Sequence, residues 1–170
     1  MSLTLAQLNA LSTEQFVVAL GGIFEHSPWV AAQAADQRPF ASMADLHDCM
    51  RRQVEEAGAE AQLRLIRAHP ELAGKAALRG DLTTESAAEQ GGAGLDQCSP
   101  QELELLRRLN ADYRACFGFP FILAVRGYQR ADIIAEFQRR LAAEPEAERL
   151  ACLQQIYRIA GLRLAELISS

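Results

Sequence analysis

The sequence predicts an all-α protein, folded as a single compact bundle of about eight or nine helices. Residues that favour helices, chiefly Ala, Leu, Glu, Gln and Arg, dominate the composition, and strand-forming residues are sparse. Helix-capping sequences recur along the chain, and apolar residues return at helical spacing. No repeat, low-complexity tract or long linker divides the 170 residues, so one domain over residues 1–170 is expected.

The first part of the chain carries clear helix starts. They are Thr4-x-x-Gln7, Ser12-x-x-Gln15, Ser27-Pro28 and Ser42. A capping side chain accepts a backbone N–H that the first turn leaves unpaired, and proline suits that turn. The expected helices end at Gly21-Gly22, Ala35 and Ala57, and a further helix runs over residues 60–67 with Leu63 and Ile66 inward. His69-Pro70 closes it, because a residue before proline is disfavoured in a helix.

Four further helices are expected after Pro70. They cover residues 71–79, a stretch capped by Thr83 or Thr84 that ends at Gly91-Gly92, residues 100–117 and residues 132–141. A last helix starts at Glu144-Pro145 and runs to about Leu167. Apolar stripes mark the two longest, at Leu103, Leu106, Leu109 and Tyr113, and at Leu150, Leu153, Ile156, Ala160 and Leu164. Residues 91–94 are expected to form a loop.

Charge and cysteine usage exclude several classes of protein. The net charge is −5, and the arginines are scattered among acids, so neither nucleic acid nor an anionic membrane is an expected partner. No run of roughly 18 apolar residues could span a bilayer. The four cysteines have neither zinc-site nor disulfide-scaffold spacing, and Met1 to Leu11 shows no signal peptide. A cytoplasmic protein with reduced thiols is therefore expected.

His69 is the first candidate for chemistry. Histidine exchanges protons near neutral pH, and the adjacent Pro70 would hold its ring in one direction. The alternative is a structural histidine that interacts with the last carbonyls of the preceding helix. His26, beside a helix cap, and His47, within a helix, are weaker candidates for which a structural role is favoured. No metal site is expected, because the histidines lack ligand spacing.

Glu89 and Gln90 are the next candidates. A carboxylate can orient an imidazole or move a proton, and an amide can bind a carbonyl or ureido group. The alternative is local, since Ser86 and Glu89 have the spacing of a capping box.

The most apolar segment of the chain covers residues 119–125, and it could be an extended stretch or a buried helix. Its ordinary role would be in the core. Yet Gly118 and Pro120 interrupt the backbone, whose N–H and C=O groups could then bind a flat, amide-rich ring. Arg126 could face a carboxylate or form a surface ion pair.

No dinucleotide, P-loop or serine-hydrolase motif is present.

Seven pieces of sequence, in order, resemble the 2-oxo-4-hydroxy-4-carboxy-5-ureidoimidazoline (OHCU) decarboxylase family. The pieces are GGIFEHSPW at 21–29, RPF at 38–40, LIRAHPELAG at 65–74, SAAEQGGAGLD at 86–96, LN at 109–110, FGFPFILAVRG at 117–127 and IAGLRLAEL at 159–167. These enzymes release carbon dioxide to give (S)-allantoin in urate breakdown. The resemblance extends from Phe16 to Leu167.

The resemblance implies an all-α homodimer without a cofactor, acting on a small molecule. It implies His69 as the acid/base group and, by our interpretation, Glu89 as its catalytic partner. The implied substrate contacts are Pro70, Ser86, Ala87, Ala88, Glu89, Gln90, Phe121, Ile122, Leu123, Ala124 and Val125. Arg126 joins them as our own prediction, because it directly follows the segment and could face the carboxylate. Glu71 stands where the family often has aspartate, which conserves the charge. The chain ends without the peroxisomal tripeptide of some members, which also favours the cytoplasm.

Two rival functions stay open at this point. One is a non-enzymatic helical module that binds a partner through residues 119–125, which would require an exposed apolar patch. The other is a decarboxylase of another small ureido or hydroxy acid.

Overall fold

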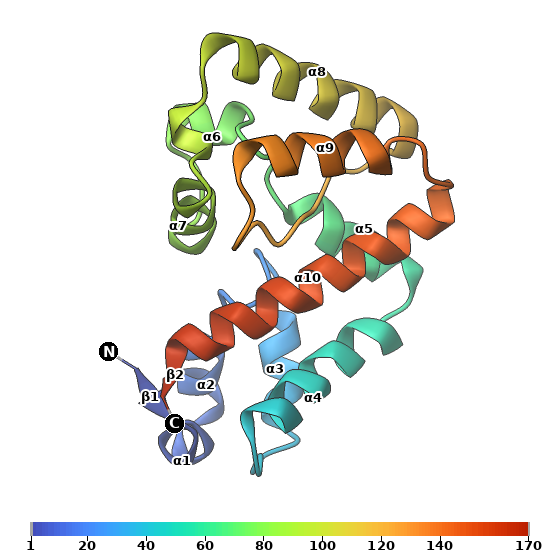
Figure 1. The fold of residues 1–170 in the computed structure, drawn as a ribbon. Helices are drawn as coiled ribbons and strands as arrows, with labels where there is room; N and C mark the ends of the chain where they lie inside the picture. The colour runs from blue at the N-terminus through green and yellow to red at the C-terminus, as the bar shows by residue number, and fades with distance from the viewer. Residues whose placement is uncertain (1, 170) are drawn as a thin grey trace. The chain divides into compact units, whose positions relative to one another are not determined.

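The computed structural model describes residues 2–169, which form ten α-helices, one 3-10 helix and one two-stranded parallel sheet (Figure 1). The predicted all-α class is confirmed. The sheet pairs Leu3–Thr4 with Ile168–Ser169, near the two ends of the chain, and no sequence pattern indicated it. Met1 and Ser170 lie outside the described residues. The predictions about signals at the two termini therefore fall partly outside them too.

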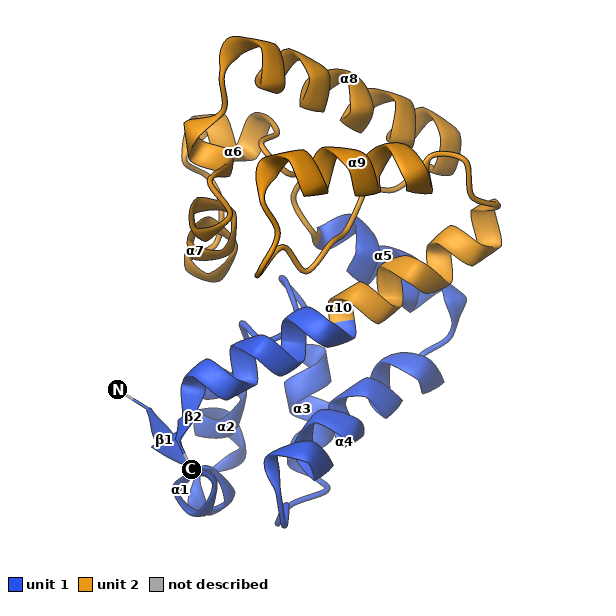
Figure 2. Ribbon diagram, viewed as in Figure 1, with its two compact units in different colours: residues 1–68, 157–170 blue, residues 69–156 orange. Residues whose placement is uncertain are grey.

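The described chain divides into two compact units (Figure 2). The first unit, residues 1–68 and 157–170, contains β1 (Leu3–Thr4), α1 (Leu5–Ala10), α2 (Thr13–Leu20), α3 (Trp29–Ala35), α4 (Met43–Glu56), α5 (Ala59–Ala68), the end of α10 (Pro145–Leu167) and β2 (Ile168–Ser169). The second, residues 69–156, contains α6 (Lys75–Arg79), α7 (Thr84–Gly92), η1 (Leu95–Gln97), α8 (Pro100–Phe117), α9 (Arg130–Arg140) and the start of α10.

The local signals for helix starts are mostly confirmed. Thr4, Ser12 and Ser99 each form a complete capping box with the residue three positions later. Ser42 also accepts a backbone N–H, from Asp45. The Ser27 prediction was wrong: its hydroxyl donates to the carbonyl of Glu25 at 2.8 Å, so it does not cap α3. The capping oxygen is used by a tighter local turn.

Three predicted inward-facing leucines do not lie in the core, and one of them, Leu103 of α8, is half-buried. In α5 the buried residues are Gln62, Leu65 and Ile66, while Leu63 is only half-buried. At the start of α10, Leu150 is 49% exposed, although the rest of its predicted stripe is buried. The face that a helix buries depends on its neighbours, and helical spacing alone leaves that face uncertain by about one position.

The first unit buries an ion pair that joins the loop before α3 to α10. Arg163 Nη2 lies 2.9 Å from Glu25 Oε2, and both side chains are at most 4% exposed. Arg163 also donates to the carbonyl of Gly22 at 2.8 Å. In the same unit, His47 Nε2 lies 2.7 Å from the carbonyl of Tyr157, which gives this histidine the structural role expected for it.

The second unit is built around an aromatic cluster. Tyr113 of α8 meets Phe121 and Phe137 edge-on, with ring centroids 5.4 and 5.8 Å apart. Phe121 and Phe137 stack on each other at 3.9 Å. Such arrangements add to the apolar burial of large rings. The cluster therefore fixes the segment around Phe121 against α8 and α9.

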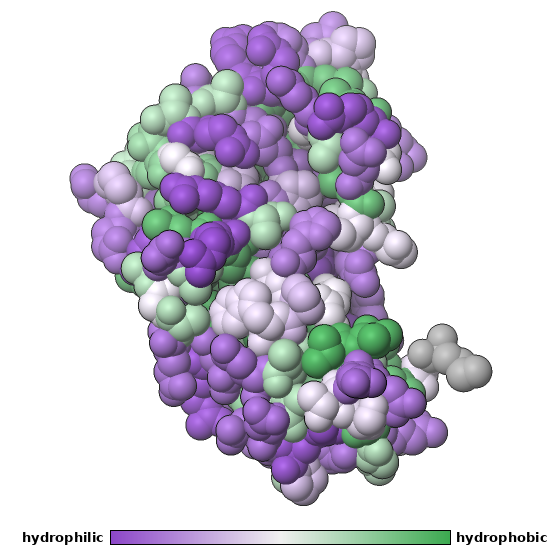
Figure 3. All heavy atoms as spheres, turned by 180° about the vertical axis from the view of Figure 1, so that it is seen from behind, coloured by the Kyte–Doolittle hydropathy of each residue, from purple (hydrophilic) through white to green (hydrophobic). Residues whose placement is uncertain are grey.

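Among residues 2–169, the large apolar side chains that are exposed are Val18, Met43, Leu78 and Leu150. The face drawn in Figure 3 is mostly hydrophilic, with small separated apolar patches. Within the described chain, no helix combines the length and apolar character needed to cross a bilayer.

Candidate active site

His69, the first predicted site residue, lies in the turn after α5 and is buried, with 7% of its surface exposed. The helix ends at Ala68, as the following proline predicted. The helix expected over residues 71–79 was wrong in its first half, because α6 begins only at Lys75. Ala73 has a φ of 51°, a left-handed conformation that an alanine rarely adopts and that cannot continue a right-handed helix.

Two side chains from distant helices hold this turn. Gln90 of α7 accepts the N–H of Ala73 at 3.0 Å and donates to the carbonyl of Glu71 at 3.3 Å. Asn110 of α8 donates to the carbonyl of Leu72 at 3.0 Å. Three consecutive residues of the turn are thus bound by tertiary hydrogen bonds. These bonds satisfy buried backbone groups that a helix would otherwise pair.

The turn also has a link on its exposed side. Arg114 Nε donates to Glu71 Oε1 at 2.9 Å, and the arginine side chain is about half exposed. The conserved charge expected at Glu71 therefore has a structural use in the second unit. Exposed pairs of this kind stabilise a fold only slightly.

Of the predicted residues of α7, Gln90 binds the same turn, whereas Ala87 and Ala88 are exposed. Thr83 is the N-cap and accepts the N–H of Ser86, so the capping box proposed for Ser86 and Glu89 does not form. Ser86 and Gln90 are buried, and Glu89 is half-buried. Ser86 lies inside α7, so the capping-box alternative for Glu89 is wrong.

The glycines after Glu89 were only partly predicted. The helix ends at Gly92, as expected, but Gly91 and Gly92 are helical and do not belong to a loop. The loop is confined to Ala93 and Gly94, and Gly94 has a φ of 76°, which suits glycine.

The apolar segment is neither helix nor strand, and the whole of residues 119–125 is buried. Gly118 ends α8 in the left-handed conformation with a φ of 78°. Arg140 Nη1 donates to the carbonyl of Ile122 at 2.6 Å, and the N–H of Ala124 donates to Gln155 Oε1 at 3.0 Å. The segment is thus an irregular backbone held by side chains of α9 and α10. Arg126, just beyond it, is exposed.

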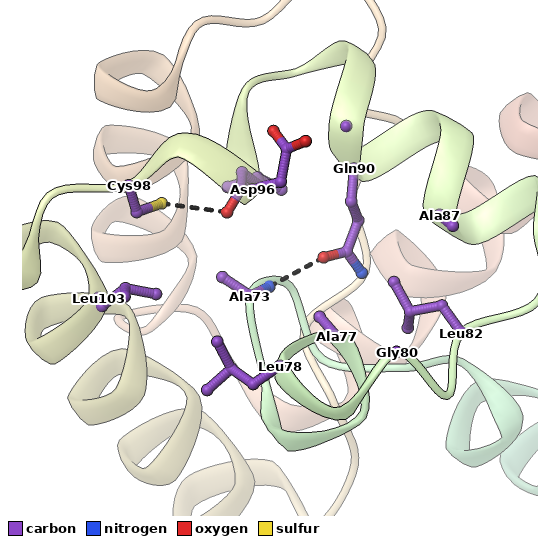
Figure 4. Close-up of a pocket in the computed structure, with 12 residues that line it drawn as sticks. Ala73, Ala77, Leu78, Gly80, Leu82, Ala87, Gln90, Asp96, Cys98 and Leu103 are labelled. Atoms are coloured by element: carbon purple, nitrogen blue, oxygen red, sulfur yellow. Dashed lines mark hydrogen bonds between the residues drawn. The ribbon is translucent and has the colours of Figure 1, made fainter.

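A cavity of about 390 Å³ lies between α6, α7, η1 and α8 (Figure 4). Most of the residues that line it are small or aliphatic. Figure 4 shows the side-chain amide of Gln90 pointing to the backbone of Ala73, with which it forms a hydrogen bond. Of the predicted site residues, Ala87 and Gln90 line the cavity. Within the described part of the chain, His69, Glu89 and residues 121–125 are not among its lining residues.

The structure therefore brings together some of the predicted residues. The turn after His69 and α7 are joined through Gln90, which places two predicted groups in one neighbourhood. Residues 121–125 are fixed separately, against α9 and α10. Among residues 2–169, no three His, Cys, Asp or Glu side chains gather as a metal site would require.

Sequence analysis missed the two buried ion pairs, Glu25 with Arg163 and Arg140 with Glu148. All four side chains are buried, although charged residues are almost never fully buried unless paired. A charged residue inside an apolar stripe is the signal that could have found Arg163. Glu148 precedes the first residue of the predicted stripe, and Glu25 and Arg140 lie outside any predicted stripe, so these three had no such signal.

We expect Gln90→Leu to lower the free energy of unfolding by about 1–3 kcal/mol. The substitution leaves the buried N–H of Ala73 without its acceptor. It also removes one of two donors to the carbonyl of Glu71, which still accepts the N–H of Gly74 at 3.4 Å. Urea unfolding of this variant measures the effect, with Gln97→Leu, at an exposed position, as the control. Equal stabilities of the two variants would contradict the role assigned to Gln90.

The comparisons with known proteins agree with these motifs. The family model described as OHCU decarboxylase matches residues 9–165, a span that includes both units. A 2-oxo-4-hydroxy-4-carboxy-5-ureidoimidazoline decarboxylase of Haloferax volcanii is 45% identical over 168 residues, covering 99% of this chain and 98% of its own. The mouse protein of the same name is 37% identical, covering 98% and 93% of the two chains.

A solved structure of an (S)-allantoin synthase superposes with a TM-score of 0.79 at 29% identity. The match covers 98% of this chain and 54% of that one, so this chain spans about half the length of the solved protein. Both the sequence and the fold therefore place this chain among the same proteins. The chain belongs to the OHCU decarboxylase family.

Proposed function

We propose that this protein decarboxylates OHCU to (S)-allantoin and carbon dioxide in urate degradation. The observation that carries the proposal is the match to the family over nearly the whole chain, at 45% identity to the Haloferax volcanii decarboxylase. That match includes every residue predicted for the site, from His69 to Arg126.

The reaction sets three tasks for the protein. The bond from the hydroxyl-bearing ring carbon to the carboxylate breaks, and its electron pair moves into the adjacent unsaturated ring carbon–nitrogen bond, whose nitrogen takes up a proton. The hydroxyl loses its proton, and a proton adds to one face of the ring carbon that carries the ureido group. Because the substrate itself accepts the electrons, the protein must orient it, exclude water and deliver the proton to one face.

His69 is the proposed acid/base group, acting on the hydroxyl or protonating the ring carbon. Its burial and its turn, held by Gln90 and Asn110, support a fixed ring direction. A fixed direction favours protonation of a single face, which sets the S configuration. Glu89 would set the tautomer of the imidazole or assist the transfer.

The remaining predicted residues are proposed to bind the substrate. Pro70 and the α7 residues Ser86, Ala87, Ala88 and Gln90 would line one side. Gln90 already binds the turn with both ends of its amide, so any substrate contact must use its remaining hydrogen-bonding capacity. Backbone groups of residues 121–125 would hold the ring and the ureido arm, and Arg126 would face the carboxylate.

Glu89→Gln separates two roles for this side chain. We expect a fall in kcat of about 10²-fold or more, with little change in melting temperature, because Thr83 and not Ser86 caps α7. Steady-state kinetics and thermal unfolding of the same preparation measure both quantities. A stability loss with an unchanged rate would assign Glu89 to the fold instead.

The activity itself is tested with freshly generated OHCU. Circular dichroism should report (S)-allantoin forming faster than the slow, racemic spontaneous product. A racemic product at the spontaneous rate would refute the proposed function. Formation of carbon dioxide from another ureido acid, but not from OHCU, would favour the alternative substrate.

The rival binding module has lost its main requirement. It needs an exposed apolar patch over residues 119–125, and all seven residues are buried.

We also propose that the enzyme acts in the cytoplasm and that it is a homodimer, as the family resemblance implied. Light scattering should then give about twice the chain mass of 18.7 kDa, and a monomer mass would contradict the dimer.

A further inference from the structure

We propose that Gln155, together with Arg140, is a positioning residue that holds residues 121–125 in the conformation that binds substrate. This inference rests on the proposed function, which places that segment on the substrate. Neither side chain is among the residues predicted for the site, and both form hydrogen bonds with the backbone of the segment.

The backbone of the segment is irregular. Residues 121–125 belong to no helix or strand, so regular secondary structure does not determine where their N–H and C=O groups point. Two long side chains do so instead. Arg140 Nη1 donates to the carbonyl of Ile122 at 2.6 Å, and Gln155 Oε1 accepts the N–H of Ala124 at 3.0 Å.

Arg140 is itself held by several contacts. Its Nε donates to Glu148 Oε1 at 2.6 Å, and both side chains are at most 4% exposed. Tyr113 donates to the same carboxylate oxygen at 2.5 Å, and burial raises the pKa of its phenol far above the usual range, so it stays a donor. The guanidinium also lies over the ring of Phe121, 4.4 Å from its centroid. These contacts restrain the guanidinium, and with it the donor that holds the carbonyl of Ile122.

One buried residue lies between the two that Arg140 and Gln155 bind. Leu123 lies between Ile122 and Ala124, and it is 4% exposed. Among the hydrogen bonds found within residues 2–169, none involves the backbone of Leu123. Buried backbone groups are nearly always paired, so this N–H and C=O are suited to an amide-rich ligand. Gln155 and Arg140 would thus present Leu123 to the ring and ureido groups of OHCU.

The test removes and restores the acceptor at position 155. Gln155→Met keeps the length of the side chain but cannot accept the N–H of Ala124, and Gln155→Ala is a second variant without the acceptor. Gln155→Glu keeps an oxygen at the same place. Gln154→Met, at the neighbouring exposed position, is the matched control. Steady-state kinetics with OHCU and thermal unfolding are measured for all four variants and the parent.

We expect Gln155→Met and Gln155→Ala to raise KM about tenfold, because one hydrogen bond that orders the binding segment is lost. Their kcat should stay within about threefold of the parent, since proton transfer at His69 is untouched. Gln155→Glu and Gln154→Met should keep the parental KM. A lower melting temperature with a parental KM in both variants would show a merely structural role and overturn the inference. Failure of Gln155→Glu to restore KM would overturn it too.

The parent enzyme separates this inference from the proposed function. A parent that converts OHCU, with variants that match it in KM, sinks only the positioning role. A parent that does not convert OHCU sinks the proposed function, and the positioning role with it.

Discussion

His69→Asn is expected to lower kcat for OHCU by about 10²- to 10⁴-fold in a protein that still folds. This range is the usual contribution of one positioned proton-transfer group. Asparagine keeps a polar side chain at this buried position but cannot exchange a proton near neutral pH. Single-turnover measurement of (S)-allantoin by circular dichroism gives the rate of the chemical step.

His26→Asn is the matched control for this variant. The side chain of His26 is 66% exposed, and its φ of 48° is one that asparagine tolerates better than most residues. This control should keep the parental rate. A folded His69→Asn enzyme that makes (S)-allantoin at the parental rate would show that the imidazole has no part in the chemistry.

Arg140→Met is expected to lower the free energy of unfolding by about 3–5 kcal/mol. Removing one partner of a buried ion pair leaves the other charge buried without compensation. Here Glu148 would lose its bond to Arg140 at 2.6 Å, and Ile122 would lose the donor to its carbonyl. Equilibrium urea unfolding measures the loss.

Arg139→Met tests whether the effect belongs to the buried pair. Arg139 is the neighbouring residue in α9, but its side chain is 70% exposed, and it pairs with Glu136 on the surface. Exposed pairs contribute about 0–1 kcal/mol, so this variant should resemble the parent. Equal losses for the two arginines would contradict the structural role given to Arg140.

Helix starts could be predicted because their causes lie within four residues. The capping boxes at Thr4, Ser12 and Ser99 need only a hydroxyl and an amide or carboxylate three positions later. The turn over residues 71–74 could not be predicted, because its backbone is bound by Gln90 and Asn110, which lie 17 to 38 positions further along the chain. An Ala-rich sequence favours a helix there, and tertiary hydrogen bonds override that preference.

In the candidate site too, local motifs could be predicted and long-range contacts could not. The residues of His69-Pro70, α7 and residues 121–125 were found because they form motifs that resemble one family. The groups that support them were missed, since Arg140, Glu148 and Gln155 resemble ordinary surface residues of amphipathic helices. Only the folded chain shows that two of these three are buried and that all three contact each other or the backbone of the segment.

The central claim is that His69, Glu89 and residues 121–125 act on one bound molecule. A crystal structure of this enzyme with (S)-allantoin tests it most directly. We expect the ligand within hydrogen-bonding distance of the His69 imidazole, with its amide groups on the backbone of residues 121–125. Allantoin bound instead in the cavity beside Leu78 and Leu95, away from His69, would contradict the account.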